Sequence, residues 1–591
     1  MTELIVRERD VIERQATHLI GTLGHVSEGK STLIRALTGI KTQRHQKEQE
    51  RNITIHLGYA NCKVFQDEVT GELTTNPSPS SSLVAHLSFV DCPGHEAFLA
   101  TMMGGASIMD TACLIIAANQ EVIPQPQTLE HLMAAHLMGL ERLVVVQNKL
   151  DLLTATEATD NYAKIKTFVA DTNAEHSPVY PTSAQHGWGV SNVLEYLTGL
   201  PTPERRLNAP AQLTCVRSFD VNKPGPFIVG KTELKGGIIG GTLQQGVLVV
   251  GDWIELRPGV LSRGRCGDIV ARPILTRVCG LRCETTELPY AIPGSLIAIA
   301  TDLDPGLAIA NGMVGQRVGV PGTLPPIVGE LVVRFRAMKR DEFAFSKQKV
   351  GDQVKVCSNV MTVTGVIIET DKKVRRIRLD RPLCLAVGEM VGVLRMNTGA
   401  GRELLEGAGE VREVVEWTDI VHPVDSTANA NAAVGRVIRW EPMTPTEFNH
   451  PHLSYTDLLE RVMARKEEKA GAGVKFKLKE PVTERFKKHI IWVNWPTIVQ
   501  LLDTGVFDVT HAQNLDEYLQ KELLTTTSVN GQGQLVMKGI WKLEDLRSIL
   551  RKYVAAYKRC KQCDGYETGL VKAGKVLKVR CIRCNADNVI D

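Results

Sequence analysis

Residues 18–39 read HLIGTLGHVSEGKSTLIRALTG, and this stretch decides the fold of the first part of the chain. HLIGTL is an apolar run typical of a buried strand, and STLIRALTG has the apolar spacing of a helix. Between them, GHVSEGKS fits the phosphate-loop pattern G-x-x-x-x-G-K-S, in which backbone N–H groups and a helix N-terminus surround phosphate oxygens. We expect Lys30 to reach the β- and γ-phosphates of a nucleotide, and the Ser31 hydroxyl to ligate Mg²⁺.

Three further motifs follow apolar runs of the same kind. DCPG at 91–94 follows LVAHLSFV, where the carboxylate can hold Mg²⁺ through water and the glycine N–H can contact the γ-phosphate. NKLD at 148–151 follows RLVVVQ, and TSA at 182–184 follows the next run. The Asp151 carboxylate can accept hydrogen bonds from the N1–H and the exocyclic amine of guanine, donors that adenine lacks. Together these motifs predict a guanine-nucleotide site.

The order of the apolar runs predicts several domains in a chain of 591 residues. Strand-like and helical stretches alternate from residue 17 to about 200, which indicates a mainly parallel α/β sheet. Short β-rich runs separated by Gly and Pro fill residues 211 to about 415 and favour two antiparallel β-barrels. Residues 417–452 resemble an exposed linker in which VGRVIRW is one possible extra strand.

The last part of the chain carries a candidate zinc ribbon. Cys560-x2-Cys563 is followed after 17 residues by Cys581-x2-Cys584, a spacing that presents four thiolates from two knuckles. Four free cysteines are the alternative, and disulfides are disfavoured in the cytosol.

The whole chain is therefore expected to be a multidomain α/β plus β protein, with a P-loop GTPase domain, two β-barrels, a small α/β domain and a zinc ribbon. The expected boundaries are an N-terminal extension at 1–16, a GTP-binding domain at 17–205, β-barrels at 206–325 and 326–416, the linker at 417–452, an amphipathic helix at 453–470, an α/β domain at 471–556 and the ribbon at 557–591.

Composition and charge narrow the class of protein. Hydrophobic residues make up 43% and charged residues 23%, which excludes wholesale disorder. The N-terminus resembles neither a secretory signal nor a transit peptide, and no apolar run approaches the roughly 20 residues that a bilayer requires, so we expect a cytoplasmic protein. Residues 451–591 hold 24 Lys and Arg against 17 Asp and Glu, which suits a polyanion such as RNA, although solvated charge explains it equally.

Four segments make residues 17–415 similar to the γ subunit of eukaryotic and archaeal initiation factor 2. They are ERNITIHLGYAN at 50–61, VDCPGHEAFLATMMGGASIMD at 90–110, QEVIPQPQTLEH at 120–131 and VRSFDVNKPG at 216–225. The resemblance implies a GTPase that uses GTP/GDP and Mg²⁺ and carries initiator methionyl-tRNA to the small ribosomal subunit. It also implies an α-type subunit on the first barrel, a GTPase activator and an exchange factor.

The resemblance and the motifs together assign the site residues. Thr54 would ligate Mg²⁺ with Ser31 and Asp91, and His95 would orient the attacking water. The catalytic set is therefore His95, Thr54 and Lys30. The nucleotide-binding set is Gly24, His25, Val26, Ser27, Glu28, Gly29, Lys30, Ser31, Thr32, Asp91, Gly94, Asn148, Lys149, Asp151, Ser183, Ala184 and Gln185.

Two features depart from that family. Ser27-Glu28 stands where the family commonly has Ala or Asp followed by His, so an acidic side chain lies near the phosphates and would weaken affinity or alter hydrolysis. Residues 62–89 lack the family's Cys-rich knuckle, since they hold only Cys62, and no metal is expected there.

Residues 453–591 resemble the β subunit of the same factor. LSYTDLLERVMAR at 453–465 makes an amphipathic helix, and the family implies that such a helix docks on the γ-type GTP-binding domain. Packing on the adjacent α/β domain is the alternative. The Lys-rich N-terminal tail of eukaryotic β subunits has no counterpart here, which puts recruitment of an exchange factor and an activator through that tail in doubt.

Two rival functions remain open from the sequence. A GTP-binding scaffold with weak hydrolysis, which sequesters tRNA or a translation factor, is compatible with the altered Ser27-Glu28 loop. An elongation-type GTPase is disfavoured by the LGYAN segment and by the β-like tail.

Overall fold

The chain forms two compact units, Met1–Glu460 and Arg461–Asp591. The computed structural model describes residues 3–43, 48, 54–170, 172–222, 235–264, 268–337, 348–371, 373–397, 402–422, 436–443, 453–470, 479–503, 510–560, 566–573, 576–582 and 587–589. Within these ranges, no helix is both long and apolar enough to cross a membrane.

The first domain is built on a seven-stranded sheet with the order β4-β3-β5-β2-β6-β7-β8. Strands β5, β2, β6, β7 and β8 are parallel, and β3 runs antiparallel to β5. The bounds are β2 (His18–Leu23), β3 (Gly58–Asp67), β4 (Leu73–Thr74), β5 (Ser81–Asp91), β6 (Thr111–Ala117), β7 (Leu143–Asn148) and β8 (Val179–Pro181). The five apolar runs of the sequence are the five parallel strands. The β3 strand escaped prediction because its buried face carries small residues, Gly58, Ala60 and Cys62, and forms no apolar run.

Helices cover both faces of this sheet. One face carries α2 (Lys30–Thr38) and α7 (Val190–Thr198), and the other carries α4 (Leu99–Ala106), α5 (Pro126–Leu137) and α6 (Ala155–Val169). Since successive strand residues point to opposite faces, Leu19 packs into the core under α4 to α6 and Ile20 into the core under α2 and α7. Short helices α1 (Glu8–Ile12), η1 (Glu96–Phe98) and η2 (Leu150–Leu152) complete the domain.

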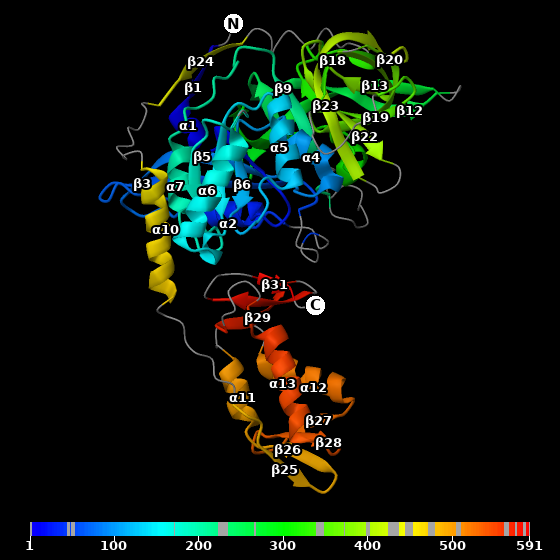
Figure 1. Ribbon diagram of the computed structural model, residues 1–591. Coiled ribbons are helices and arrows are strands. Elements are labelled where there is room, and N and C mark those ends of the chain that lie inside the picture. Colours follow the sequence, from blue (N-terminus) through cyan, green and yellow to red (C-terminus); the bar gives the residue numbers. More distant parts are fainter. Residues whose placement is uncertain are drawn as a thin grey trace. The chain divides into compact units, whose positions relative to one another are not determined.

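Two β-barrels follow, drawn mainly in green in Figure 1. Six strands of the first, in the order β12-β17-β9-β10-β16-β13, close through the β12–β13 pair. Its elements are β9 (Gln212–Phe219), β10 (Ile238–Gln245), β11 (Leu248–Val249), β12 (Trp253–Arg263), β13 (Ile269–Cys283), β14 (Thr286–Leu288), β15 (Tyr290–Ala291), β16 (Leu296–Thr301), α8 (Pro305–Ala308), η3 (Ile309–Asn311) and β17 (Arg317–Gly319).

The second barrel closes in the order β18-β21-β20-β19-β22-β23. Its strands are β18 (Ile327–Ala337), β19 (Gln353–Ser358), β20 (Met361–Thr370), β21 (Val374–Cys384), β22 (Met390–Asn397) and β23 (Arg402–Glu416). The prediction of an α/β GTPase-type domain followed by two barrels is therefore confirmed.

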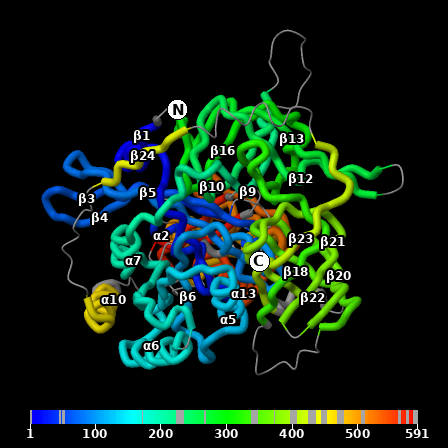
Figure 2. The backbone as a smooth tube through the Cα atoms, turned by 90° about the horizontal axis from the view of Figure 1, so that it is seen from above, coloured from blue at the N-terminus to red at the C-terminus, as the bar shows by residue number. Residues whose placement is uncertain are grey.

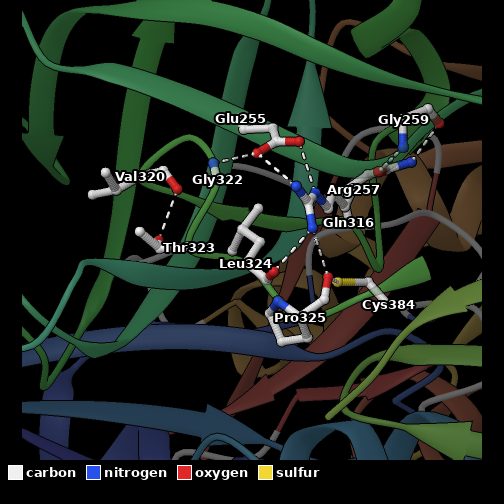
Figure 3. A network of polar contacts seen from close by, with 10 residues as sticks. All are labelled: Glu255, Arg257, Gly259, Gln316, Val320, Gly322, Thr323, Leu324, Pro325 and Cys384. Carbon is white, nitrogen blue, oxygen red and sulfur yellow. Dashed lines mark hydrogen bonds and ion pairs between the residues drawn. The ribbon is translucent and has the colours of Figure 1, made fainter. Parts of the chain in front are cut away.

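A polar network fixes the connection between the two barrels (Figure 3). Arg257 pairs with the almost fully buried carboxylate of Glu255 at 2.7 Å and donates to the carbonyl oxygens of Leu324 at 2.9 Å and Pro325 at 3.0 Å. The Cys384 thiol donates to the same Pro325 carbonyl at 3.2 Å. Because Glu255 belongs to the first barrel and Cys384 to the second, this network holds both barrels on one short connection.

A parallel strand pair joins the start of the chain to the segment after the second barrel. The strand β1 (Glu3–Arg7) pairs with β24 (Val437–Glu441), and both views show the two strands side by side (Figure 1, Figure 2). A small core that includes Val6 and Ile438 underlies the pair. The strand suggested within the linker is thus β24, and Met443 N–H donates to the Glu8 carboxylate at 2.8 Å. The linker is therefore anchored as far as Met443.

The second unit holds a small α/β module and a three-stranded antiparallel sheet. The module has the sheet order β25-β26-β28-β27, and the other sheet has the order β29-β30-β31. Helix α10 (Tyr455–Ala470) precedes β25 (Thr483–Phe486), β26 (His489–Trp492), α11 (Trp495–Leu502), α12 (His511–Leu523), β27 (Thr527–Val529), β28 (Leu535–Lys538), α13 (Leu543–Tyr557), β29 (Thr568–Ala573), β30 (Val576–Cys581) and β31 (Asp587–Val589).

Candidate nucleotide site

The phosphate loop lies between β2 and α2, as its sequence predicts. Gly24 and Gly29 have φ values of 139° and 101°, a backbone region that residues with a Cβ rarely adopt, and Ser27 has a φ of 65°. Lys30 is buried, and its ammonium donates to the carbonyl oxygens of Gly24 at 2.9 Å and His25 at 2.6 Å. Burial lowers the pKa of Lys30, and the charges of Glu28 and Asp91 oppose that shift. The lysine therefore lies across its own loop, where a nucleotide phosphate would meet it.

Glu28 is an internal part of the loop. Its side chain is fully buried, and the carboxylate accepts hydrogen bonds from the His25 N–H at 2.5 Å and from the Thr128 hydroxyl at 3.1 Å. A Cβ on Gly24 would come within 2.4 Å of the Glu28 carboxylate, so the acid fills the space that the glycine leaves. Burial raises the pKa of Glu28 to about 7, against the opposing charge of Lys30.

That pKa predicts that nucleotide affinity falls as the pH rises through about 7. The carboxyl group is neutral below this pH and charged above it, and bound phosphates would favour the neutral form further. One linked proton changes affinity by at most about tenfold per pH unit, so we expect a fluorescent GDP to bind roughly three- to tenfold more tightly at about pH 6 than at about pH 8. Glu28→Gln should remove most of this dependence. Glu121→Gln, which changes an exposed carboxylate of the same domain, should preserve it; a dependence that survives in Glu28→Gln would belong to another group.

Helix α5 supports the loop from the side through two residues that the sequence did not single out. Thr128 accepts a second bond from the His25 N–H at 3.1 Å, and the buried His131 accepts from the Gly24 N–H at 3.1 Å through Nδ1. Burial lowers the pKa of His131 well below its usual value, which keeps Nδ1 free of a proton and able to accept. Both residues lie in the segment QEVIPQPQTLEH, so the signal was present but carried no stated role.

Three oxygen donors predicted to ligate Mg²⁺ gather beside the loop. The Ser31 and Thr54 hydroxyl oxygens lie 3.1 Å apart, and Ser31 also bonds to the Asp91 carboxylate. Asp91 is fully buried at the end of β5 and accepts from the Thr42 hydroxyl at 2.6 Å. Burial raises the pKa of Asp91, and these hydroxyl bonds oppose the shift. An all-oxygen donor set of this kind suits Mg²⁺.

Gly94 and His95 approach the same loop from the DCPG turn. A Cβ at Gly94 would lie 2.3 Å from the Lys30 ammonium, so the glycine permits this close approach. His95 is exposed, and its Nδ1 accepts from the Ala97 N–H at 3.1 Å. The other ring nitrogen is the one that this bond does not engage.

The base-recognition motifs meet at the next strand ends. The Asn148 amide donates to the Glu28 carbonyl oxygen at 2.8 Å and accepts from the Ala184 N–H at 2.9 Å, so it ties together the phosphate loop and both base loops. The Ser183 hydroxyl donates to Asp151 Oδ1 at 2.6 Å and thereby orients that carboxylate. Lys149 has a φ of 65°, and burial lowers its pKa while Glu28 and Asp151 oppose the shift.

The structure thus gathers the predicted nucleotide residues at one edge of the sheet. Those not yet placed occupy the loop, the first turn of α2 and the turn after β8, and they are Val26, Thr32 and Gln185.

The predicted zinc ligands fall only partly within the described residues. Cys560 and Cys581 are buried, the first three residues beyond α13 and the second at the end of β30. Cys563 and Cys584 lie outside the described residues. Among the residues that are described, no group of three or more His, Cys, Asp and Glu side chains is arranged to hold a metal.

Comparisons with known protein families match both ends of the chain. Residues 15–202 match the family model of the elongation factor Tu GTP binding domain, and residues 466–587 match the model of the domain found in initiation factors 2B and 5. The chain is 41% identical over 416 residues to eukaryotic translation initiation factor 2 subunit 3 of Drosophila melanogaster, which covers 65% of this chain and 87% of that protein. It is 40% identical over 394 residues to translation initiation factor 2 subunit gamma of Methanocaldococcus jannaschii, covering 65% and 94%.

Solved structures with a similar fold include two elongation factors. The first is SelB of Methanococcus maripaludis with a GTP analogue, at a TM-score of 0.52 and 18% identity over 69% of this chain and 82% of that chain. The second is a bacterial selenocysteine-specific factor, EF-Sec, at a TM-score of 0.52 and 20% identity over 90% and 81%. Identities this low support a shared fold and nothing further.

Proposed function

The chain belongs to the family of γ subunits of translation initiation factor 2, and from this premise we propose that its GTP complex carries initiator methionyl-tRNA to the small ribosomal subunit. The protein is a GTP-dependent translation initiation factor and a GTPase. Its C-terminal domain, of the type found in initiation factors 2B and 5, adds a β-like part to the γ-like part in one polypeptide.

The observation that carries the proposal is the meeting of phosphate, hydroxyl and base-recognition groups at the carboxyl ends of β2, β5, β7 and β8. Lys30 would hold the β- and γ-phosphates, and Asp151, oriented by Ser183, would accept the two guanine donors. Ser31 and Thr54 would ligate Mg²⁺ directly and Asp91 through water. Bound Mg²⁺ would supply charge neutralisation of the phosphates.

The switch would operate through the segments that carry Thr54 and His95. Both adjoin the phosphate loop, so contacts to the γ-phosphate would order them in the GTP state and hydrolysis would release them. His95, through the ring nitrogen that does not bond to Ala97, would orient the attacking water.

The proposed partners follow from the family. They are initiator methionyl-tRNA, the small ribosomal subunit, an α-type subunit, a GTPase activator and possible exchange factor, all in the cytoplasm and without a membrane. We also propose a Zn²⁺ ion held by Cys560, Cys563, Cys581 and Cys584, which would staple the C-terminal sheet.

A tRNA-binding assay with the full chain tests this function. We expect labelled initiator methionyl-tRNA to bind the GTP form at least about tenfold more tightly than the GDP form, the order of coupling usual for such switches. Elongator methionyl-tRNA is the matched control and should bind more weakly. Equal binding of both tRNAs would contradict the proposal.

Single-turnover hydrolysis on small ribosomal subunits separates the carrier from a GTP-binding scaffold. The wild-type chain should hydrolyse GTP, and His95→Ala should slow the step by about 10² or more while GTP affinity stays the same, because the imidazole acts only on the water. A chain that binds tRNA but shows no stimulated hydrolysis would instead be the scaffold.

A further inference from the structure

The first turn of α10 makes a specific contact with the GTP-binding domain. The Tyr455 hydroxyl donates to Gln147 Oε1 at 2.6 Å and lies 3.2 Å from the Ala158 carbonyl oxygen. The Tyr455 ring stacks on the Tyr162 ring with centroids 3.7 Å apart and planes inclined by 13°. Burial raises the pKa of the Tyr455 hydroxyl, so it remains a donor at every relevant pH.

Gln147 is the residue immediately before Asn148, and a closed set of hydrogen bonds links the two. The Gln147 amide donates to Asn161 Oδ1 at 2.9 Å, and the Asn161 amide donates to the Ala118 carbonyl oxygen at 2.9 Å. The Ala118 N–H then donates to the Asn148 carbonyl oxygen at 2.8 Å. The side chains of Gln147, Asn148 and Asn161 are all buried.

The Gln147 backbone also reaches the second base loop. Its carbonyl oxygen accepts from the Thr182 N–H at 2.8 Å and from the Thr182 hydroxyl at 3.3 Å. The same hydroxyl lies 3.4 Å from Asn148 Oδ1, the oxygen that also holds the Ala184 N–H. A shift of Gln147 would therefore move both loops that are proposed to surround the guanine base.

We propose that Tyr455 is a positioning residue of the guanine-nucleotide site, so that docking of α10 slows nucleotide release. The inference rests on the proposed guanine site and adds its regulation by the β-like part of the same chain. The physical reason is that Gln147 Oε1 is a buried acceptor whose partner is the Tyr455 hydroxyl. Without that hydroxyl, the oxygen loses its bond unless the end of β7 moves.

The linker favours a docked helix. Because β24 anchors the chain as far as Met443, only residues 444–452 separate the anchored part from Leu453. A connection this short gives α10 a high effective concentration at the domain, in the millimolar range or above. Occupancy of the Tyr455 contact is thus a property of the intact chain.

Dissociation of a fluorescent GDP from the full chain, followed by stopped flow, tests the inference. Tyr455→Phe keeps the stacked ring and removes one hydrogen bond, so we expect a rate about two- to twelvefold above wild type, the range that one such bond contributes. The GTP and GDP rates should rise by the same factor, because Asn148 and Thr182 adjoin the base and not the γ-phosphate. The matched control is Ser454→Ala, which removes the hydroxyl that bonds to Asp457 at the start of α10 and leaves Gln147 untouched; its rate should stay within about twofold of wild type.

Three results would overturn the inference. The first is an unchanged rate in a folded Tyr455→Phe chain, and the second is an equal rise in Ser454→Ala, which would show that helix anchoring alone is responsible. The third is additivity with Asn161→Ala, since two groups of one network should give a combined effect smaller than the product of the single effects. Failure of the proposed guanine site is distinguishable, because the wild-type chain would then show no preference for guanine over adenine nucleotides.

Discussion

Asp151→Asn is expected to change the base preference of the nucleotide site from guanine to xanthine. The Asp151 carboxylate would accept two hydrogen bonds from guanine, and bonds to charged groups contribute about 1.5–3 kcal/mol each. Their loss corresponds to roughly two to four orders of magnitude in affinity for GDP and GTP. Xanthine presents an acceptor where guanine has its amine, so the introduced amide should bind xanthine nucleotides better than the wild-type carboxylate does.

Competition titrations with guanine, xanthine and adenine diphosphates measure this change. Ser183→Ala is the informative companion variant, because it removes the 2.6 Å bond that orients Asp151 and leaves the carboxylate in place. It should weaken guanine binding by a smaller factor and bring no gain for xanthine. An equal loss of all three nucleotides in Asp151→Asn would mean that the residue supports the fold and does not read the base.

Much of the fold follows from local patterns. The strands β2, β5, β6, β7 and β8 were predictable because a strand buried on both faces forms a continuous apolar run. The pairing of β1 with β24 was not predictable, since each strand is five residues long and the pair joins residues more than 430 positions apart. The shared core around Val6 and Ile438 stabilises that pair, and such a core has no signature in either segment alone.

The site shows the same division. Ser31, Thr54 and Asp91 were expected to converge because motifs at the carboxyl ends of parallel strands share one edge of the sheet, and their oxygens do lie together. The inward position of Glu28 was not foreseen, because its partner Thr128 is 100 residues away. Sequence placed an acid near the phosphates, and the structure adds that this acid is buried and bonded within the loop.

Removal of zinc is expected to unfold the C-terminal sheet and to spare nucleotide binding. Structural zinc sites contribute on the order of 10 kcal/mol to small modules that have almost no core. The intact chain should contain about one zinc ion, and chelation should abolish amide-exchange protection over β29 and β30. The effect should also reach the end of α11, because the buried Lys558 ammonium donates to both the Leu502 and the Thr568 carbonyl oxygens at 2.6 Å.

Variants separate the metal from the thiols themselves. Cys560→Ser and Cys581→Ser should each lose zinc and protection in β29 and β30, whereas Cys279→Ser, which changes an exposed cysteine of the first barrel, should keep both. Protection of β7 and affinity for GDP should be unchanged in all three, because the nucleotide residues lie in the other compact unit. If zinc is retained in Cys560→Ser and Cys581→Ser, the ion is held elsewhere. If the sheet stays protected after complete chelation, the Lys558 contacts and its short apolar core, which includes Leu570 and Val579, suffice to hold it without a metal.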